Sequence, residues 1–578
     1  MRATVLSRRK RLAAFSATCA IALSGAIITQ SAHADAGTPD VGNIDTNTKG
    51  TFTLHKRESG SMSGPGQLGN IAQASTGGTP VPGVTFTYYP ITGLDLKTSE
   101  AWQHLDNLAD IRTGCAAAQA EEQNLRQVGG HALGPGHEMT PTGPEGDTVS
   151  PQLPVGAYLV CETGTPTSVK RAAQPFVVTI PTPLPKNQGW TYNVHAYPKN
   201  TVIQTPTKTA ALDVTKSGVG TKHQVTFTIA AKIPQLARAV PKVSNEQELF
   251  TYFVIGDSLI KEYSDGVIEK VEFADDANGL NATAIENPAR NYTIQDSTNQ
   301  PQEFKHWLNV TFTFPGRELL LKKANKYVIV TIKATANAVG DTGHLDNTGY
   351  LIVDTDMQST DGPPMEPRNP EYFPPQHPGE APTRKNQNGP SPITPTNKAV
   401  TTWGQAKLKK HSTDPSETPL KDAVFQIHLA EKQDDPTCPS NEISTAHPDA
   451  ISVNGKTEFT SNNEGVVTVP GLAVGAGQGV GDAQPTAEPA YRCYVFVEKT
   501  PPLGYVLPEG KKRQVAVSVT PGQVAAPTVT MPNAPVSVPE LPITGASGTV
   551  LATILGSSLL LAAVGSALLR RREAAVNE

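Results

Sequence analysis

The sequence has 578 residues, a formal net charge of −5, 37% hydrophobic residues and 17% charged residues, and its length allows roughly three or four domains. Its 49 glycines and 50 prolines make up about a sixth of the chain, which disfavours helical bundles and coiled coils and favours short strands joined by turns. The mild negative charge and the absence of basic blocks argue against a nucleic-acid-binding protein.

The N-terminus is typical of an export signal. Basic residues at positions 8–11 precede a small apolar segment, and Ala32-His33-Ala34 forms a cleavage motif. We therefore predict that residues 1–34 are a signal peptide and that the mature chain begins at Asp35. A membrane anchor is the alternative, but the apolar segment is short and interrupted.

The mature chain alternates strand-like segments with turn residues, and this spacing predicts an all-β protein of tandem immunoglobulin-like β-sandwich domains. We expect an N-terminal domain at 35–200, a middle domain at 201–358 and a C-terminal domain at 400–535, with a proline-rich linker at 359–399. A short helix is expected at 101–111. The expected strands are 51–56, 84–89, 157–162, 176–180, 224–231, 307–314, 327–334, 350–353, 423–429, 465–470, 493–498 and 515–519.

Of the five cysteines, Cys19 would leave with the signal peptide. The remaining four form an even set in an exported chain, which favours disulfides. Because they fall into two separate regions, Cys115–Cys161 and Cys438–Cys493 is the economical pairing, and each bond would stabilise the fold by roughly 4 kcal/mol in the chain-entropy model. A metal site is the alternative, but no C-x-x-C or H-x₃-H spacing supports one, and no cofactor is expected.

The C-terminus carries three elements in order. An LPITG segment precedes an apolar run at 546–569, which is long enough to span a bilayer as a helix, and basic residues at 570–572 follow. This order resembles the cell-wall sorting signal of Gram-positive surface proteins, so we expect residues 536–578 to be a sorting signal. The LPITG residues are Leu541, Pro542, Ile543, Thr544 and Gly545.

The resemblance implies how this tail is processed. In that family a membrane sortase, acting through a cysteine thiolate, cleaves between Thr544 and Gly545. The Thr544 carbonyl becomes a thioester and is passed to an amine, which divides a difficult amide exchange into two easier acyl transfers. The apolar helix would hold the precursor at the membrane until cleavage.

Two internal segments resemble the landmarks of major pilins, the shaft subunits of sortase-assembled pili. Residues 190–199, WTYNVHAYPK, resemble the pilin motif, and residues 493–505, which end in EKTPPLGY, resemble the E-box. With the sorting signal, three landmarks occur in the family's order across nearly the whole mature chain. The resemblance implies immunoglobulin-like domains of the CnaA and CnaB types; in the pilin motif, Ala196 stands where valine is usual.

Lys199, within the pilin motif, is the candidate nucleophile for polymerisation. Strand alternation places it on the polar, accessible face, opposite the face of Trp190 and Val194. The resemblance implies an isopeptide bond from Lys199 to Thr544 of the next subunit. An ordinary lysine is nearly all protonated at neutral pH, so we expect the sortase site to desolvate or deprotonate the amine. A solvated surface lysine is the alternative.

The resemblance also implies isopeptide bonds inside the domains. Each needs a lysine, an asparagine and an acid between them in an apolar core, because burial favours a neutral amine and a protonated acid. Lys216 and Lys409 compete with Lys208 and Lys410, and buried ion pairs without a covalent bond are the alternative. The candidate trios are Lys56, Glu162 and Asn200 in the N-terminal domain, Lys208, Asp257 and Asn347 in the middle domain, and Lys410, Glu498 and Asn533 in the C-terminal domain.

These features predict a structural subunit of a covalent pilus that is anchored to the cell wall and supports adhesion. The expected partners are pilus-specific and housekeeping sortases, other copies of the chain, minor or tip pilins, and peptidoglycan; the sequence names no host receptor. A monomeric wall-anchored adhesin or a minor basal pilin is the alternative. An enzyme is not expected, because no G-x-S-x-G or H-E-x-x-H motif occurs.

Overall fold

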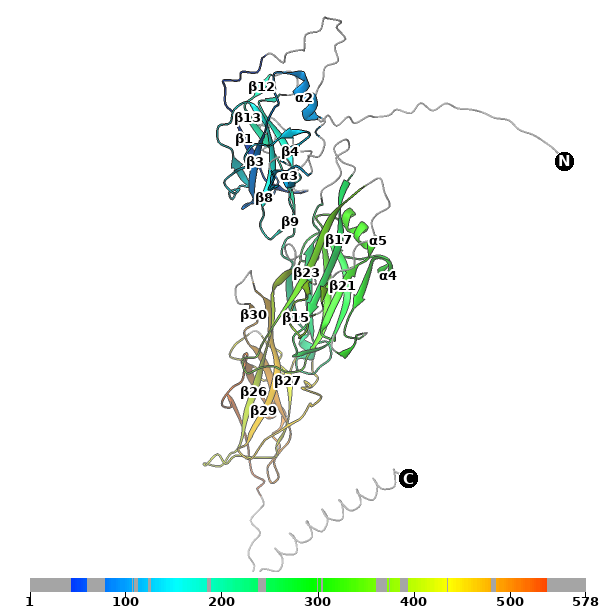
Figure 1. Ribbon diagram of the computed structural model, residues 1–578. Coiled ribbons are helices and arrows are strands. Elements are labelled where there is room, and N and C mark those ends of the chain that lie inside the picture. Colours follow the sequence, from blue (N-terminus) through cyan, green and yellow to red (C-terminus); the bar gives the residue numbers. More distant parts are fainter. Residues whose placement is uncertain are drawn as a thin grey trace, which may run out of the picture.

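The structure, a computed structural model, describes residues 43–537 except for 60–77, 107, 109–112, 123–125, 185–188, 237–245, 299, 303–304, 360–371, 374, 385–392, 434 and 480–484. The described residues form three β-rich regions that follow one another along an elongated molecule (Figure 1), and the all-β prediction is confirmed. No helix among them is long and apolar enough to cross a membrane. The predicted signal peptide and the LPITG segment lie outside the described residues.

The N-terminal region packs two sheets around an apolar core. One sheet has the order β13-β1-β7, and beside it β2 pairs with β14; the facing sheet has the order β10-β8-β3-β6. The first and last strands run parallel, with Lys199 opposite Arg57 and Asn200 opposite Glu58. The elements are β1 (Thr51–His55), β2 (Arg57–Glu58), β3 (Thr85–Ile91), α2 (Ser99–Asp106), α3 (Gly114–Ala118), β4 (Gln127–Val128), β5 (His131–Ala132), β6 (His137–Glu138), β7 (Asp147–Val149), β8 (Gly156–Gly164), β9 (Val169–Arg171), β10 (Phe176–Ile180), β11 (Thr182–Pro183), β12 (Trp190–Thr191), β13 (Asn193–Ala196) and β14 (Lys199–Val202).

The middle region is a sandwich of two sheets. A five-stranded sheet, β15-β16-β22-β18-β19, faces the strands β20-β21-β17-β23 of a larger sheet. Phe227, Phe253 and Phe312 are fully buried in the core between them. The elements are β15 (Thr207–Leu212), η3 (Val214–Lys216), β16 (Val225–Lys232), β17 (Glu246–Ser258), β18 (Tyr263–Ala274), β19 (Thr283–Ala284), α4 (Pro288–Asn291), β20 (Tyr292–Gln295), β21 (Trp307–Phe312), α5 (Phe314–Lys322), β22 (Tyr327–Ala336) and β23 (His344–Ser359).

The C-terminal region packs β26, β29, β30 and β33 against the sheet β28-β27-β31-β32. The last strand, β33, runs parallel to β26, with Lys410 opposite Met531. The elements are β24 (Tyr372–Phe373), β25 (Thr383–Arg384), β26 (Ile393–Ser412), β27 (Val424–Leu429), β28 (Phe459–Thr460), β29 (Val466–Gln478), β30 (Thr486–Glu488), β31 (Arg492–Thr500), η5 (Gly510–Arg513), β32 (Gln514–Val519) and β33 (Val529–Asn533).

One strand, β26, belongs to both the middle and the C-terminal regions. Its 20 residues pair first with β23 and then with β29 and β33. The expected linker at 359–399 is corrected accordingly: residues 393–399 are already strand, and β24 pairs with β25 earlier in the segment. Pro395 is tolerated in the strand because the register shifts beside its partner, Tyr350.

The strands lie where the alternation of apolar residues predicts them, whereas the sequence predicted the helices less accurately. Phe52, Leu54 and Lys56 share the core face and are fully buried, as their spacing of two predicts. The helix expected at 101–111 is α2, which ends at Asp106. The sequence did not predict α3, because a five-residue helix is too short to show a helical period.

Candidate functional site

Lys199 is the first residue of β14 and follows a break in the strand. β13 ends at Ala196, and Tyr197 and Pro198 carry the chain to β14, so the motif is not one continuous strand. The Lys199 side chain is half-buried, and desolvation lowers its pKa. Among the described residues it has no hydrogen-bond or ion-pair partner. Such an amine is neutral more often than one in free water, and the neutral form is the nucleophile.

Near this lysine, a chain of polar side chains joins β1, β7 and β13. Nδ1 of His55 lies 2.9 Å from Oδ1 of Asp147, and its Nε2 lies 2.9 Å from Nδ1 of His195. Tyr197 stacks on His55 with 4.6 Å between ring centres, and Nη1 of Arg57 donates to Asp147 at 3.1 Å. Burial and the neighbouring His55 lower the pKa of His195. Sequence reasoning missed this chain because only strand pairing brings its members together.

In the N-terminal region the structure brings Lys56, Glu162 and Asn200 together in the core. Nζ of Lys56 lies 2.7 Å from Oε2 of Glu162, and Nδ2 of Asn200 donates to Oε1 of Glu162 at 2.7 Å. Desolvation lowers the pKa of Lys56 to about 8, although the Glu162 carboxylate opposes that shift. Oδ1 of Asn200 is buried and accepts no hydrogen bond from the described residues.

In the middle region Lys208, Asp257 and Asn347 meet between the two sheets. Nζ of Lys208 donates to Oδ2 of Asp257, and Nδ2 of Asn347 donates to Oδ1 of Asp257 at 3.1 Å. Desolvation lowers the pKa of Lys208 and raises the pKa of Asp257, so burial favours the neutral form of each. The acid and the amide lie on adjacent strands, β17 and β23, and the lysine of β15 reaches them from the facing sheet.

In the C-terminal region Lys410, Glu498 and Asn533 form the third buried cluster. Nζ of Lys410 donates to Oε2 of Glu498 at 3.0 Å and also to Oδ1 of Asn533, while Nδ2 of Asn533 donates to Oε1 of Glu498 at 2.8 Å. Desolvation lowers the pKa of Lys410 and raises the pKa of Glu498. The lysine and the amide come from the parallel strands β26 and β33, and the acid comes from β31 across the core.

The three clusters share one chemical capability. A neutral amine can attack the side-chain carbonyl of asparagine while the neighbouring acid transfers protons. The competing lysines lie elsewhere: Lys216 contacts Asp213 at 3.4 Å on the surface, and Lys409 points away from the face of Lys410 because strand residues alternate. Within the described ranges, no group of His, Cys, Asp and Glu side chains is arranged to hold a metal ion.

Both predicted disulfides are present. Cys115–Cys161 joins α3 to β8 with an S–S distance of 2.04 Å, and Cys438–Cys493 joins a loop to β31 with an S–S distance of 2.09 Å. The two strands that carry a cysteine, β8 and β31, are also the strands that carry the acids of the N-terminal and C-terminal clusters.

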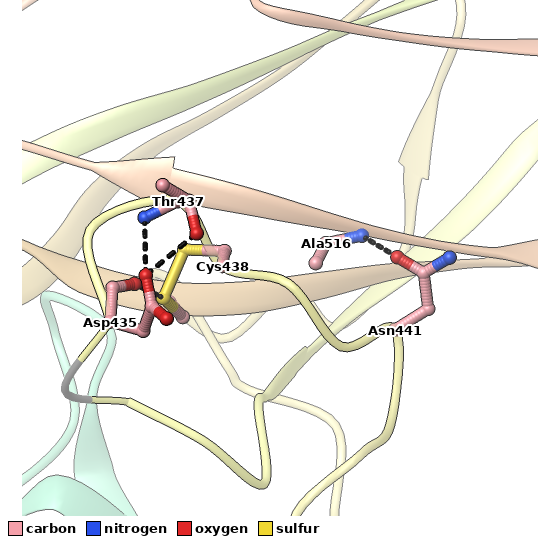
Figure 2. Close-up of a disulfide and its surroundings, with 6 residues drawn as sticks. Asp435, Thr437, Cys438, Asn441 and Ala516 are labelled. Carbon is pink, nitrogen blue, oxygen red and sulfur yellow. Dashed lines mark hydrogen bonds between the residues drawn. A yellow bond between two sulfur atoms is a disulfide. The ribbon is translucent and has the colours of Figure 1, made fainter.

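Figure 2 shows the second disulfide and the loop it holds. The backbone N–H and the hydroxyl of Thr437 both donate to Oδ1 of Asp435, at 2.9 and 2.6 Å. Oδ1 of Asn441 accepts from the backbone N–H of Ala516 at 2.7 Å. The loop at 435–441 is therefore fastened covalently to β31 through Cys438 and by a hydrogen bond to β32.

Comparison with known proteins identifies the family. Residues 47–201 match the family described as Gram-positive pilin subunit D1, N-terminal domain. The chain is 31% identical to fimbrial subunit type 2 of Actinomyces naeslundii over 566 residues, which cover 96% of each chain. The chain belongs to the Gram-positive fimbrial subunits. This fimbrial subunit is also 26% identical over 552 residues to fimbrial subunit type 1 of Actinomyces viscosus, covering 93% of each chain.

A solved structure supports the fold of this fimbrial subunit. The full-length major pilin SpaD from Corynebacterium diphtheriae matches with a TM-score of 0.54 and 23% identity, covering 86% of this chain and 99% of that chain. At this identity the match shows a shared arrangement of tandem immunoglobulin-like sandwiches.

Proposed function

We propose that this fimbrial subunit forms the shaft of a covalent pilus, in which Lys199 of one copy is joined to Thr544 of the next. The observation that carries this proposal is the position of Lys199: it is half-buried, has a pKa lowered by desolvation, and has no partner among the described residues. Such an amine loses its proton more easily than an ordinary surface lysine.

The joining reaction is an exchange of one amide for another. A sortase cysteine thiolate attacks the Thr544 carbonyl, the Thr544–Gly545 peptide bond breaks, and Gly545 leaves as an amine after taking a proton. The neutral Nζ of Lys199 then attacks the thioester, its extra proton is lost, and the thiolate departs as the isopeptide bond forms. No oxidant or external energy source is needed, because each step is an acyl transfer.

Within each subunit, the three buried clusters would form isopeptide bonds of their own. The neutral amine of Lys56, Lys208 or Lys410 attacks the side-chain carbon of its asparagine, the neighbouring acid moves the protons, and one ammonia leaves per bond. Each bond would join the first and last strands of its region, so that pulling force passes through a covalent bond rather than through the sheet.

The partners follow from this role. A pilus-specific sortase would join the copies, a housekeeping sortase would attach the fibre to peptidoglycan, and minor or tip pilins would be joined to its ends. The apolar run at 546–569 would hold the precursor at the membrane until cleavage. The role is structural, because each internal bond forms only once in the life of a molecule.

Replacement of the polymerising lysine tests the proposal. Cell-wall extracts boiled in detergent should show a high-mass ladder with the native chain, and Lys199→Ala should reduce the ladder to monomer. Lys49→Ala is the matched control, because Lys49 is an exposed lysine of the same region, and it should leave the ladder intact. A ladder that persists in Lys199→Ala would refute the linkage site.

A further inference from the structure

A row of polar side chains on the outer face of the N-terminal region ends at Lys199. The other face of β1 is buried in the core, so alternation places Thr53, His55 and Arg57 on the outer face. The partner strands β13 and β14 keep one register across their break, from His195 opposite Thr53 to Lys199 opposite Arg57. His55 and Arg57 are therefore presented on the same face as Lys199.

Asp147 of β7 joins two members of this row. The register places it directly opposite His55, and its Oδ1 lies 2.9 Å from Nδ1 of His55. The same oxygen accepts a hydrogen bond from Nη1 of Arg57 at 3.1 Å, in a contact between opposite charges. One carboxylate oxygen thus holds the side chains of both His55 and Arg57.

The backbone beside Asp147 is shaped to seat the Arg57 side chain. Nη1 of Arg57 also donates to the carbonyls of Glu145 at 2.8 Å and of Lys56 at 3.0 Å. Between these contacts Gly146 has a φ of +70°, and a Cβ there would lie only 2.8 Å from Nη1 of Arg57. Glycine is suited to this position because it has no Cβ and adopts positive φ without strain. The guanidinium is therefore fixed by backbone carbonyls as well as by the carboxylate.

The two side chains that this carboxylate holds contact the segment that carries Lys199. The Tyr197 ring stacks on His55 with 4.6 Å between ring centres, and the backbone N–H of Arg57 donates to the carbonyl of Pro198 at 3.2 Å. Lys199 itself has no hydrogen-bond or ion-pair partner among the described residues. The place from which its amine leaves the sheet is therefore set by the two residues before it, which rest on His55 and Arg57.

The ion pair of Asp147 contributes little to stability. The Asp147 side chain is 38% exposed, and ion pairs that are open to water add little to the free energy of unfolding. Acyl transfer is far more sensitive to geometry, because a shift of about 1 Å in a reacting group can slow a reaction roughly 100-fold. A contact of small energy can therefore have a large effect on the rate at which Lys199 reacts.

We propose that Asp147 is a positioning residue for the transfer of the Thr544 acyl group to Lys199. It acts through His55 and Arg57, which hold residues 197–199 so that the amine meets the thioester from a fixed direction. This inference rests on the proposed Lys199–Thr544 linkage, and it adds a residue that lies outside the segment resembling the pilin motif.

The rate of ladder formation tests this role. In pulse-labelled cells, Asp147→Ala should convert precursor into the high-mass ladder about tenfold more slowly than the native chain. Asp147→Asn keeps an acceptor oxygen at the same place and should recover part of the rate. Asp275→Ala is the matched control and should polymerise at the native rate, because Asp275 is 39% exposed and accepts from Nζ of Lys326 at 2.6 Å in the middle region. A native rate in Asp147→Ala, or equal rates in the two Asp147 variants, would overturn the inference.

Attachment of single subunits to the cell wall separates positioning from folding. Attachment uses Thr544 and does not use Lys199, so Asp147→Ala should be attached in native amounts, with a larger share as monomer. A parallel loss of attached protein and of ladder would show that Asp147 serves folding alone and would overturn the inference. Absence of the Lys199–Thr544 branched peptide from native fibres would instead overturn the proposed function and this inference with it.

Hydrogen exchange locates the effect within the protein. Asp147→Ala should speed amide exchange severalfold in residues 197–202 and leave residues 156–162 of β8 unchanged, because the contacts that are lost hold only the segment before Lys199. Equally faster exchange in β8, or unchanged exchange in residues 197–202, would contradict the positioning role.

Discussion

The N-terminal and C-terminal regions place the same chemical groups at equivalent positions. In each, a buried lysine and a buried asparagine lie on neighbouring parallel strands, and an acid reaches them from a facing strand that also carries a disulfide. The facing strands hold Cys161 and Glu162 in β8, and Cys493 and Glu498 in β31. In both regions, therefore, the lysine and the asparagine of neighbouring strands are bonded to the same buried acid.

The two regions differ in whether the lysine donates a hydrogen bond directly to the side-chain amide of the asparagine. In the C-terminal cluster Lys410 donates to both Glu498 and Asn533, whereas in the N-terminal cluster the described hydrogen bonds join Lys56 and Asn200 only through Glu162. The N-terminal amide, Asn200, also directly follows Lys199, the half-buried first residue of β14 and the lysine proposed for polymerisation. The N-terminal region, which carries the lysine proposed for polymerisation, is thus the region whose own cluster is joined by fewer direct contacts.

Removal of the acids should have the largest effect on the two clusters. Glu498→Ala and Glu162→Ala each leave a buried lysine without its carboxylate, which costs about 3–5 kcal/mol of unfolding free energy. Both variants also lose the isopeptide bond proposed for their region, and we expect the larger loss in Glu498→Ala because Lys410 already contacts the amide that it would join. Calorimetry of the soluble chain measures both, with the exposed Glu509→Ala as the control. Unchanged unfolding of both variants would show that the clusters do not hold their regions together.

The next largest difference should be in the order in which the two proposed isopeptide bonds form. Because Lys410 already contacts the amide oxygen of its asparagine, we expect freshly made protein to lose ammonia from the C-terminal cluster before the N-terminal one. Intact mass with peptide mapping over time measures this order. The Asn533→Ala variant cannot form the C-terminal bond, so it should lose one ammonia fewer than the native chain. Protein in which the N-terminal bond is complete while the C-terminal cluster is unreacted would contradict the predicted order.

The smallest expected effect is on acid stability of the N-terminal region. The pKa of His195 lies below its ordinary value of 6.5, because the ring is buried and faces His55. As the pH falls below 6.5, the unfolded chain binds a proton that the folded chain does not, so stability decreases. His195→Gln should reduce this loss, and the exposed His377→Gln should not. Equal slopes of unfolding midpoint against pH for the native chain and His195→Gln would contradict the assignment.

Much of the architecture could be predicted because it depends on local patterns. Alternation of apolar residues located the strands, and the placement of Phe52, Leu54 and Lys56 on one face followed from their spacing. The disulfides were predictable because each pair lies within one region. The proline-rich composition of 359–399 predicted a linker over the whole segment. This was wrong for residues 393–399, because they pair with β23 as the start of β26.

The sequence by itself determined the candidates: a lysine in the segment that resembles the pilin motif, and the trios of lysine, acid and asparagine that the resemblance implies. Only the tertiary structure decided which of them meet, because Lys56 and Glu162 are separated by 106 residues and Lys410 and Asn533 by 123. It also decided that Lys199 is partly desolvated and that His55, Asp147 and His195 form a chain. The physical reason is that desolvation and hydrogen bonding depend on neighbours that strand pairing brings from distant parts of the chain.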